Sequence, residues 1–250
     1  MQDSKFDYLL RLGDASLVLG QRLSEWCGKG PALEEDIALT NVALDLIGQA
    51  RMWLSYAGEA EGKGRTEDQL AYLRDAHQFR NPLLVEQPNG SYADTLARQF
   101  LFDTWHYYLL CELQGSSDAR IGAIALKSLK EVTYHARRSA DLVVRLGDGT
   151  AESHRRMQQA IDDLWQYTGE LFDAATVDPA LVASGVACDP VSLREPWLRH
   201  VTEVLEEATL AVPADGWMQR GGHEGRHTEH LGFLLAEMQF LQRAYPGASW

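Results

Sequence analysis

The chain has 250 residues, of which 45% are hydrophobic, and its 36 acidic residues outnumber its 23 basic ones. This length and composition allow one domain with a large core. The formal net charge of −13 argues against nucleic acid and anionic membranes as partners, because both repel a negative surface.

The predicted elements are helical almost throughout. Apolar residues recur at steps of three and four, and no stretch shows the sustained alternation of a strand. The predicted helices cover, in chain order, residues 5–26, 34–58, 66–78, 92–113, 119–146, 150–172, 192–210 and 228–243. Prolines and glycines predict loops at 79–90, 173–189 and 211–226. We therefore expect an all-α fold.

No internal repeat or interdomain linker divides the sequence. We expect a single helical domain over residues 1–250, with a core bundle over about 5–172 and a helical annex over about 173–250. The second helix is apolar around most of its circumference between Ile37 and Leu54, which predicts a place in the interior of the bundle.

Cysteine usage and the first residues bear on location. Cys27, Cys111 and Cys188 are far apart, odd in number and form no Cys-x-x-Cys pair, as is usual for thiols kept reduced. Residues 1–5 lack the apolar core of a signal peptide, and no apolar run is long enough to span a bilayer. We expect a cytoplasmic protein that does not enter a membrane.

One stretch nearly forms a metal motif. Residues 130–135 read Lys-Glu-Val-Thr-Tyr-His, so Val132 stands where the carboxylate of a di-iron Glu-x-x-His pair belongs. Valine cannot bind a metal. Glu131 and His135, spaced i,i+4, share a helix face, which weakens a ligand role for them without excluding it.

The other ligand positions of such a bundle are also incomplete. Asp45 is followed three residues later by Gly48, where histidine would be needed, whereas Asp103 and His106 keep the spacing. One intact pair cannot hold two metals. A buried Asp–His hydrogen bond between helices is the simpler interpretation. We expect no catalytic residue and no metal site in this chain.

A cluster of histidines near the C-terminus leaves two interpretations open. His227 and His230 with Glu224 or Glu229 have the composition of a two-histidine, one-carboxylate metal site. However, no acidic residue elsewhere is placed beside them by sequence. The favoured alternative is that Glu229 complements a helix N-terminus and that the imidazoles form hydrogen bonds across a helix junction or a partner surface.

Five segments in the same order resemble a known family. They are Arg11-Leu12-Gly13-Asp14, Leu23-Ser24-Glu25-Trp26-Cys27-Gly28, Leu44-Asp45-Leu46-Ile47-Gly48-Gln49-Ala50-Arg51, Val85-Glu86-Gln87-Pro88-Asn89-Gly90 and His227-Thr228-Glu229-His230-Leu231-Gly232. Together they resemble the C-subunit family of the phenylacetyl-CoA epoxidases over essentially the whole chain. The resemblance implies a ferritin-like helical bundle with additional C-terminal helices.

The resemblance also implies a role in a complex. It predicts a non-catalytic structural subunit of the 1,2-phenylacetyl-CoA epoxidase, a multicomponent monooxygenase of aerobic phenylacetate catabolism. Its partners would be the catalytic di-iron A-subunit and the other components of the complex, with a homodimer when it is alone. The di-iron centre would lie in the partner, and a reductase would supply electrons. We expect Arg11, Arg22 and Arg51 of the first two helices to contribute polar contacts.

The resemblance further implies that two segments hold the CoA ester at the subunit interface. The residues are Gln78, Phe79, Arg80, Asn81, Pro179, Ala180 and Leu181. Both segments are predicted to be irregular. Arg74 and Arg80 could meet the phosphates of CoA, and Phe79 could pack against its adenine or pantetheine arm. Alternatively, the arginines pair with Asp75 or Glu67 on a solvated face.

Two other classes of function stay open. The first is an independent di-metal ferritin-like oxidase, with ligands from Asp45, Asp103, His106, Glu131 and His135. The second is a homomeric structural protein without a catalytic partner. Metal content would distinguish the first, and failure to bind a di-iron protein would distinguish the second.

Overall fold

The computed structural model describes residues 2–248, and every regular element in this range is a helix. The all-α prediction is confirmed. The chain forms two compact units: unit 1 combines the described residues up to Pro88 with those from Gly221 onward, and unit 2 is Asn89–Arg220. The predicted limit near residue 172 falls inside unit 2, and the single-domain organisation stays a prediction. No helix within 2–248 is long and apolar enough to cross a membrane.

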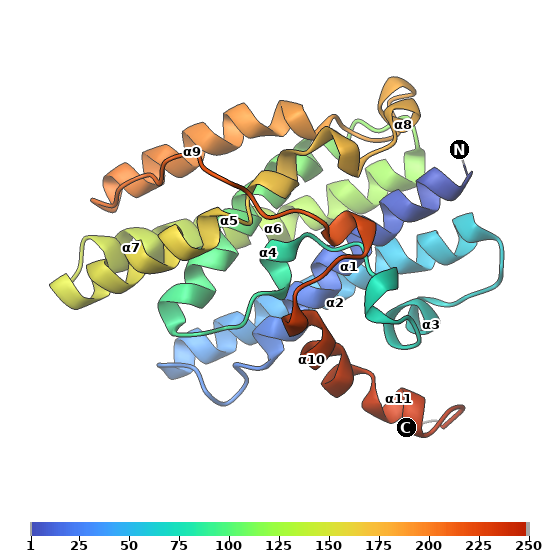
Figure 1. Ribbon diagram of the computed structural model, residues 1–250, viewed down its shortest axis with the longest axis horizontal. Helices are drawn as coiled ribbons and strands as arrows, with labels where there is room; N and C mark the ends of the chain where they lie inside the picture. Colours follow the sequence, from blue (N-terminus) through green and yellow to red (C-terminus); the bar gives the residue numbers. More distant parts are fainter. Residues whose placement is uncertain (1, 249–250) are drawn as a thin grey trace. The chain divides into compact units, whose positions relative to one another are not determined.

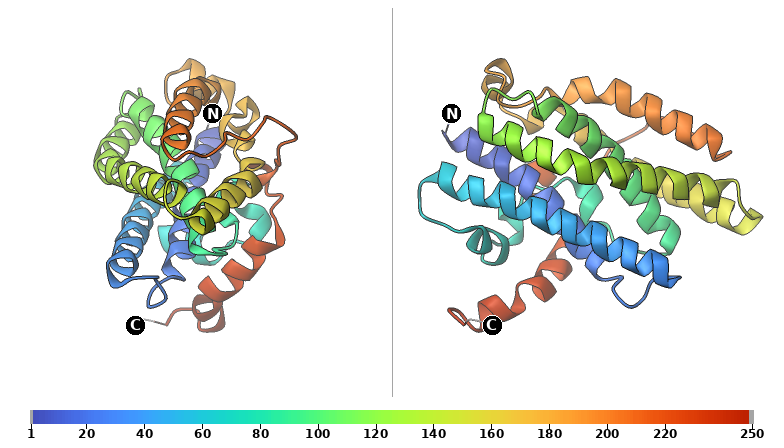
Figure 2. Two further views of the ribbon diagram at one scale, coloured as in Figure 1. Left: turned by 90° about the vertical axis from the view of Figure 1, so that its left-hand side faces the viewer. Right: turned by 180° about the vertical axis from the view of Figure 1, so that it is seen from behind.

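Unit 1 is built on two long helices, α1 and α2, that lie side by side (Figures 1 and 2). Its helices are α1 Gln2–Ser24, α2 Leu33–Glu61, α3 Glu67–Tyr72, η1 Ala76–Gln78, α4 Leu83–Glu86, η5 Gly222–Glu224, α10 Glu229–Met238 and α11 Phe240–Ala244. The last three come from the far end of the sequence. Unit 1 is therefore discontinuous in the chain.

Large apolar side chains and one glycine account for the packing of α1 on α2. Leu9, Leu46 and Trp53 are fully buried, and each such side chain contributes roughly 2 kcal/mol through the hydrophobic effect. A Cβ on Gly13 would lie 2.7 Å from Cδ2 of Leu54. Glycine at this position therefore lets the two helices approach closely.

The predicted interior location of α2 is only half right. Leu39 and Leu46 are fully buried, but Leu33 is 72% exposed, Ile37 53% and Leu44 61%. The apolar pattern runs around the helix because one side packs on α1 and the opposite side presents an uncovered apolar row. The periodicity of apolar residues alone cannot distinguish a buried helix face from an exposed apolar one.

Unit 2 is organised around α5, which is enclosed for three turns. Its helices are α5 Tyr92–Leu113, α6 Ala119–Gly147, α7 Ala151–Trp165, η2 Gly169–Phe172, η3 Ala174–Thr176, α8 Pro179–Ala183, η4 Pro190–Leu193 and α9 Arg194–Glu207. Every residue from Thr95 to His106 is buried, and α6, α7 and α9 pack against α5. Trp197 of α9 donates from its indole to the carbonyl of Leu101 at 3.0 Å.

Several segments differ from the predicted pattern. The predicted helix 66–78 is instead α3 and η1, the predicted loop 79–90 contains α4, and the predicted helix 150–172 ends at Trp165 and is followed by η2. Residues 173–189 were expected to be irregular, but Pro179–Ala183 form α8, whose N-terminus is capped when the Asp178 carboxylate accepts from the Ala180 N–H at 2.8 Å. The predicted helix 228–243 is instead two helices, separated at Gln239. The Gln239 amide turns inward and donates to the carbonyls of Ala71 and Arg74, both at 3.0 Å.

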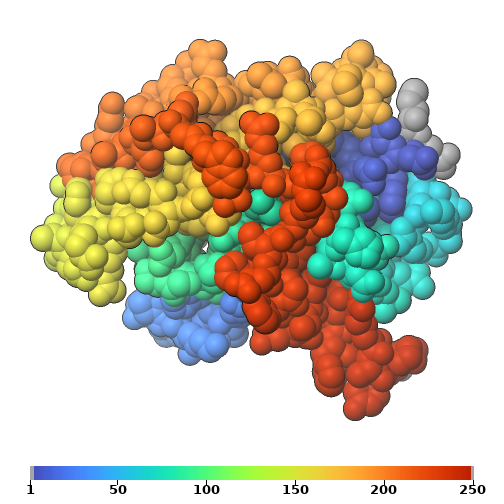
Figure 3. All heavy atoms as spheres, viewed as in Figure 1, coloured from blue at the N-terminus to red at the C-terminus, as the bar shows by residue number. Residues whose placement is uncertain are grey.

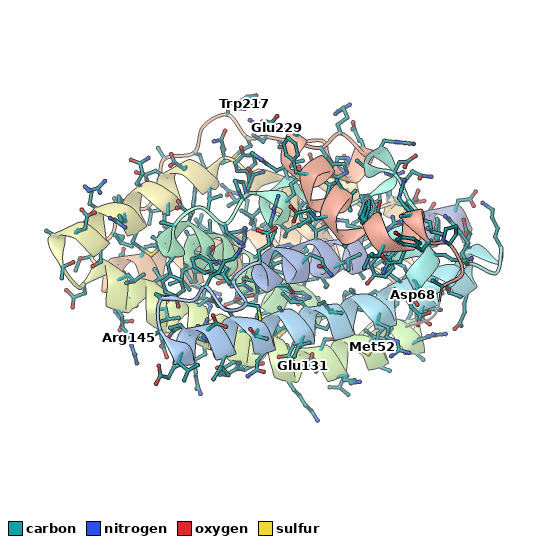
Figure 4. The ribbon with its side chains drawn as sticks, turned by 90° about the horizontal axis from the view of Figure 1, so that it is seen from below. Met52, Asp68, Glu131, Arg145, Trp217 and Glu229 are labelled. Atoms are coloured by element: carbon teal, nitrogen blue, oxygen red, sulfur yellow. The ribbon has the colours of Figure 1, made fainter. Side chains whose placement is uncertain are left out.

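The segment after α9 is held onto unit 2 without regular structure. Arg194 pairs with Asp215 at 2.7 Å, and Arg220 pairs with Asp173 at 2.8 Å. Between these ion pairs, Trp217 points away from the helices (Figure 4) and is 74% exposed.

Candidate functional site

The segment Gln78–Asn81, predicted to contact the CoA ester, begins at the last residue of η1 in unit 1. Gln78 is exposed and Arg80 is half-buried, whereas Phe79 and Asn81 have no exposed surface. The Gln78 side chain accepts from the Asp75 N–H at 2.8 Å, which fixes the start of η1. In this conformation Gln78 and Arg80 supply the accessible surface, and Phe79 is not available to pack against adenine.

One buried carboxylate, Asp14 of α1, anchors this segment. Asp14 is fully buried; it accepts from both terminal nitrogens of Arg74 and, through Oδ2, from the Arg80 backbone N–H at 2.8 Å. Arg74 also donates to the carbonyls of Leu70 at 2.5 Å and Gln78 at 2.9 Å. The Arg74 guanidinium is therefore used entirely inside unit 1 and does not meet solvent or phosphate.

Both alternatives for Arg74 are thus wrong. It faces neither a CoA phosphate nor the predicted acidic partners, because Asp75 pairs with Arg243 at 3.0 Å and Glu67 pairs with Arg51 at 3.2 Å. The true partner, Asp14, is 60 residues away in sequence.

A second buried carboxylate, Glu86 of α4, holds the other side of the segment. Its Oε2 accepts from the Asn81 side chain at 2.9 Å and lies 2.8 Å from Nδ1 of His227, while Oε1 accepts from the Thr228 N–H at 2.6 Å. Arg22 of α1 donates to the Glu86 backbone carbonyl, at 2.8 Å from Nη2. Three of the quoted sequence segments, those with Asp14, Glu86 and His227, thereby meet around residues 79–81.

Arg80 is the one cation of the segment that reaches solvent. Its Nη1 donates to the carbonyls of His77 at 3.0 Å and Phe79 at 2.9 Å. The other guanidinium N–H groups make no hydrogen bond within residues 2–248. Arg80 is thus oriented by the backbone and keeps donors free for an anionic group.

The second predicted segment, Pro179–Leu181, is the first turn of α8 in unit 2. Pro179 and Ala180 are exposed, and Leu181 is 1% exposed. Only the first two residues therefore offer surface. The roles of both segments in holding the ester stay predictions.

The buried polar side chains of α5 and α6, among them Asp103, His106 and His135, do not fit a di-iron centre. Val132 of α6 is fully buried at the position where a carboxylate would be required. Among the described residues, no group of three or more His, Cys, Asp or Glu side chains is placed to hold a metal ion. In the C-terminal cluster, the His227 nitrogens face Glu86 and the Phe79 carbonyl instead of a metal position.

Burial shifts the pKa values of two titratable groups of α5, Asp103 and His106. Burial raises the pKa of Asp103 to about 6, partly opposed by the nearby His135 and by hydrogen bonds from Ser139 and Gln99. Burial and then the charge of His135 lower the pKa of His106 to about 3. Asp103 accepts from Gln99 at 2.6 Å. The predicted Asp–His hydrogen bond is not made by His106, whose Nδ1 has no hydrogen-bond partner among the described residues.

Comparison with known proteins then decides the family. The model of the family described as phenylacetic acid catabolic protein matches residues 1–250. The chain belongs to the phenylacetic acid catabolic protein family. It is 54% identical over 243 residues to the C-subunit of the 1,2-phenylacetyl-CoA epoxidase of Escherichia coli (strain K12), covering 97% of this chain and 98% of the relative. The family resemblance seen in the sequence is confirmed.

This family member also has a groove in unit 2, distant in sequence from the Gln78–Asn81 segment. The groove has a volume of about 640 Å³ and lies along α5, α6 and α9, with Tyr107, Tyr108, Arg137, Arg145 and His200 among its lining residues. Asp141 and Glu207 balance the two arginines. The groove therefore has no net preference for an anion, in contrast to the solvent-facing Arg80.

Proposed function

We propose that this chain is the non-catalytic structural subunit of a 1,2-phenylacetyl-CoA epoxidase in aerobic phenylacetate breakdown. It pairs with the catalytic di-iron subunit and helps to hold the CoA ester. The observation that carries the proposal is the buried Val132 in place of a ligand carboxylate, in a chain that is 54% identical to a named component of such an epoxidase. Oxygen activation needs a metal centre, which the partner would supply.

The exposed row of α2 supports a partner surface on the first two helices. Leu33, Ile37, Leu44 and Arg51 fall within about 40° of one another around the helix axis, and all four are exposed. An apolar row of this kind on one helix face is typical of a protein interface. Met52 is the next residue of the same helix (Figure 4).

Of the three arginines predicted to contact the partner, only Arg51 has an exposed side chain. Arg11 is 6% and Arg22 7% exposed. Arg22 is engaged with Glu25 at 2.8 Å and with the carbonyls of Glu86 and His230. The contribution of Arg22 is therefore to the fold of unit 1, and Arg51 remains the candidate polar contact.

The CoA ester is assigned to the exposed members of the two predicted segments. In unit 1 these are Gln78 and Arg80, and in unit 2 they are Pro179 and Ala180. The free guanidinium donors of Arg80 suit a phosphate of CoA, because charged hydrogen bonds of this kind are strong and directional.

Size-exclusion chromatography with the di-iron subunit tests the function. Iron is quantified in each peak, and epoxidation is assayed with reductase and phenylacetyl-CoA. We expect this chain to be inactive and iron-free alone, to co-elute with the di-iron subunit and to be required for turnover. Iron at two atoms per chain would favour the independent oxidase, and a stable homomer that ignores the di-iron subunit would favour the homomeric alternative.

A matched pair of variants tests the partner surface. We expect Leu44→Asp to weaken association with the di-iron subunit by at least about tenfold, because it places a charge in the centre of the apolar row. Phe233→Asp, at an equally exposed site on α10 (66%), should leave association unchanged. Equal effects of the two variants would remove α2 from the interface.

A further inference from the structure

The contacts of His227 assign it a task that the proposed function does not include. We propose that His227 is a positioning residue for the CoA ester. As an imidazolium, it joins the Glu86 carboxylate to the Phe79 carbonyl and thereby fixes the Arg80 guanidinium. This inference rests on the proposed function, which assigns the ester to the Gln78–Asn81 segment.

The first step is the protonation state that the geometry requires. The His227 side chain is 4% exposed. Its Nδ1 lies 2.8 Å from Oε2 of Glu86, and its Nε2 lies 3.1 Å from the Phe79 carbonyl oxygen. Both neighbours are hydrogen-bond acceptors, and a neutral imidazole carries only one N–H. With Glu86 ionised, the two hydrogen bonds exist together only when His227 is doubly protonated.

The second step links His227 to Arg80. The Phe79 carbonyl accepts both from Nε2 of His227 and from Nη1 of Arg80 at 2.9 Å. Loss of the His227 proton removes one of these donors or leaves Glu86 without its cation. A buried carboxylate without its cation is strongly unfavourable. The backbone of residues 79–81 then relaxes, and Arg80 loses its fixed direction.

The third step concerns residues 221–228, which we call the strap, and how closely they pack on the chain around Arg80. Gly225 of the strap has φ +79°, and a Cβ there would lie 2.0 Å from the His77 carbonyl oxygen and 3.1 Å from Nη1 of Arg80. Only glycine permits this approach. Figure 3 shows the C-terminal segment lying against the chain around residues 75–85. The strap is therefore shaped to lie directly on the substrate-holding segment.

The charged and titratable groups around the pair come from four parts of unit 1. They are Asp7, Asp14 and Arg22 on α1, Arg74, His77 and Arg80 before α4, His223, Glu224 and Arg226 on the strap, and Glu229 and His230 on α10. Asp7 interacts electrostatically with Arg80. Glu224 is engaged with Arg226 and lies 3.6 Å from His223. Within the described part of the chain, Glu86 is the carboxylate that contacts the His227 ring.

The test uses the reconstituted epoxidase complex and phenylacetyl-CoA. We expect His227→Gln to raise KM about tenfold, because a charged hydrogen bond is lost, and to change kcat by less than about twofold.

His230→Gln is the matched control. It makes the same substitution three residues away, at a side chain with no hydrogen bond within residues 2–248. KM and kcat should equal those of the wild type. An identical change in both variants would overturn the inference, as would a fall in kcat and complex assembly with an unchanged KM.

The coupling to Arg80 separates this inference from the function on which it rests. Arg80→Gln should raise KM, and adding His227→Gln to it should raise KM little further. If Arg80→Gln weakens binding and His227→Gln does not, only the inference fails. If Arg80→Gln has no effect, the assignment of the ester to this segment fails as well. Should His227→Gln not fold, Glu86→Gln replaces it, with the same expected rise in KM at an unchanged kcat.

Discussion

The interiors of the two units contrast in how they keep polar groups. In unit 1 each buried carboxylate has side-chain partners: Asp14 is held by Arg74, and Glu86 by His227 and Asn81. In unit 2 the enclosed α5 carries Asp103 and His106. Burial raises the pKa of Asp103 and lowers that of His106, which favours the neutral form of each. Pairing makes the charges of unit 1 structural, because they fix a loop.

The polar groups of unit 2 have no comparable task in the fold. His106 leaves Nδ1 without a hydrogen-bond partner among the described residues, and its closest aromatic neighbours are the rings of Phe102 at 5.1 Å and Trp105 at 6.2 Å. A buried polar atom without a partner costs free energy. The contrast implies that replacing a titratable side chain by a neutral one should lower the free energy of unfolding in unit 1 and raise it in unit 2.

The largest effect is expected from Asp14→Asn. Removing this charge leaves Arg74 buried and unpaired, which should lower the free energy of unfolding by roughly 3–5 kcal/mol. Urea unfolding of the isolated chain measures it. Asp68→Asn, at an exposed acid of α3 (Figure 4), should change stability by less than about 0.5 kcal/mol. A loss below about 1 kcal/mol for Asp14→Asn would contradict the structural role of the pair.

Asp103→Asn should act in the opposite direction. The folded-state pKa of about 6, above the ordinary 3.8, means that the folded state holds the Asp103 proton more tightly than the unfolded state. The stability that this provides is present below pH 3.8 and is lost as the pH rises through 6, a loss of about 3 kcal/mol. Asparagine does not titrate, so the stability of the variant relative to wild type should rise by about that amount between about pH 4 and about pH 8.

Chemical denaturation at the two pH values measures this difference. Asparagine keeps the oxygen that accepts from Gln99, so the contact at 2.6 Å does not confound the comparison. A relative stability that is constant with pH would mean that the folded protein does not raise the pKa of Asp103, and one that falls as the pH rises would mean that it stabilises the charged form.

His106→Phe should give the smallest effect. The lowered pKa of about 3, against the ordinary 6.5, means that the stability contributed by neutral His106 is present above pH 6.5 and is lost as the pH falls toward 3. Phenylalanine does not titrate and has a similar shape. Relative to wild type the variant should gain about 2 kcal/mol in unfolding free energy between about pH 7 and about pH 5. Thermal unfolding at both pH values detects it, and a stability lower than wild type at pH 5 would reverse the interpretation.

Much of the fold follows from residue periodicity. Helices α1, α2, α5, α6 and α9 were predicted within a few residues of their ends, because their apolar spacing continues for several turns. The helix predicted to reach residue 172 ends at Trp165 as α7. Helix α8 was missed because it has a single turn and begins at Pro179, a residue that also marks loops. The break at Gln239 was missed because it depends on two carbonyls more than 160 residues away.

The candidate site was harder to predict from the sequence than the fold. Gln78–Asn81 came from the family resemblance, and the exposure of Arg80 agrees with a ligand-facing role. The burial of Phe79 could not be predicted, since it depends on Arg74, whose guanidinium lies 4.2 Å from the ring centroid. Asp14, Glu86 and His227 each stand in a quoted family segment, yet no local pattern shows that they meet, because chain separations of 60 to 148 residues are closed only by the tertiary fold.

The discontinuity of unit 1 also sets an order of events during synthesis. Glu86 and His227 are 141 residues apart, and Arg22 and the His230 carbonyl are 208 apart. A ribosome releases α1 and α2 long before the strap, so an early chain holds Glu86 without His227, and contacts of such long range form late. The Gln78–Asn81 segment thus gains its full set of contacts only after nearly the whole polypeptide has emerged, and a product truncated before the strap lacks these contacts.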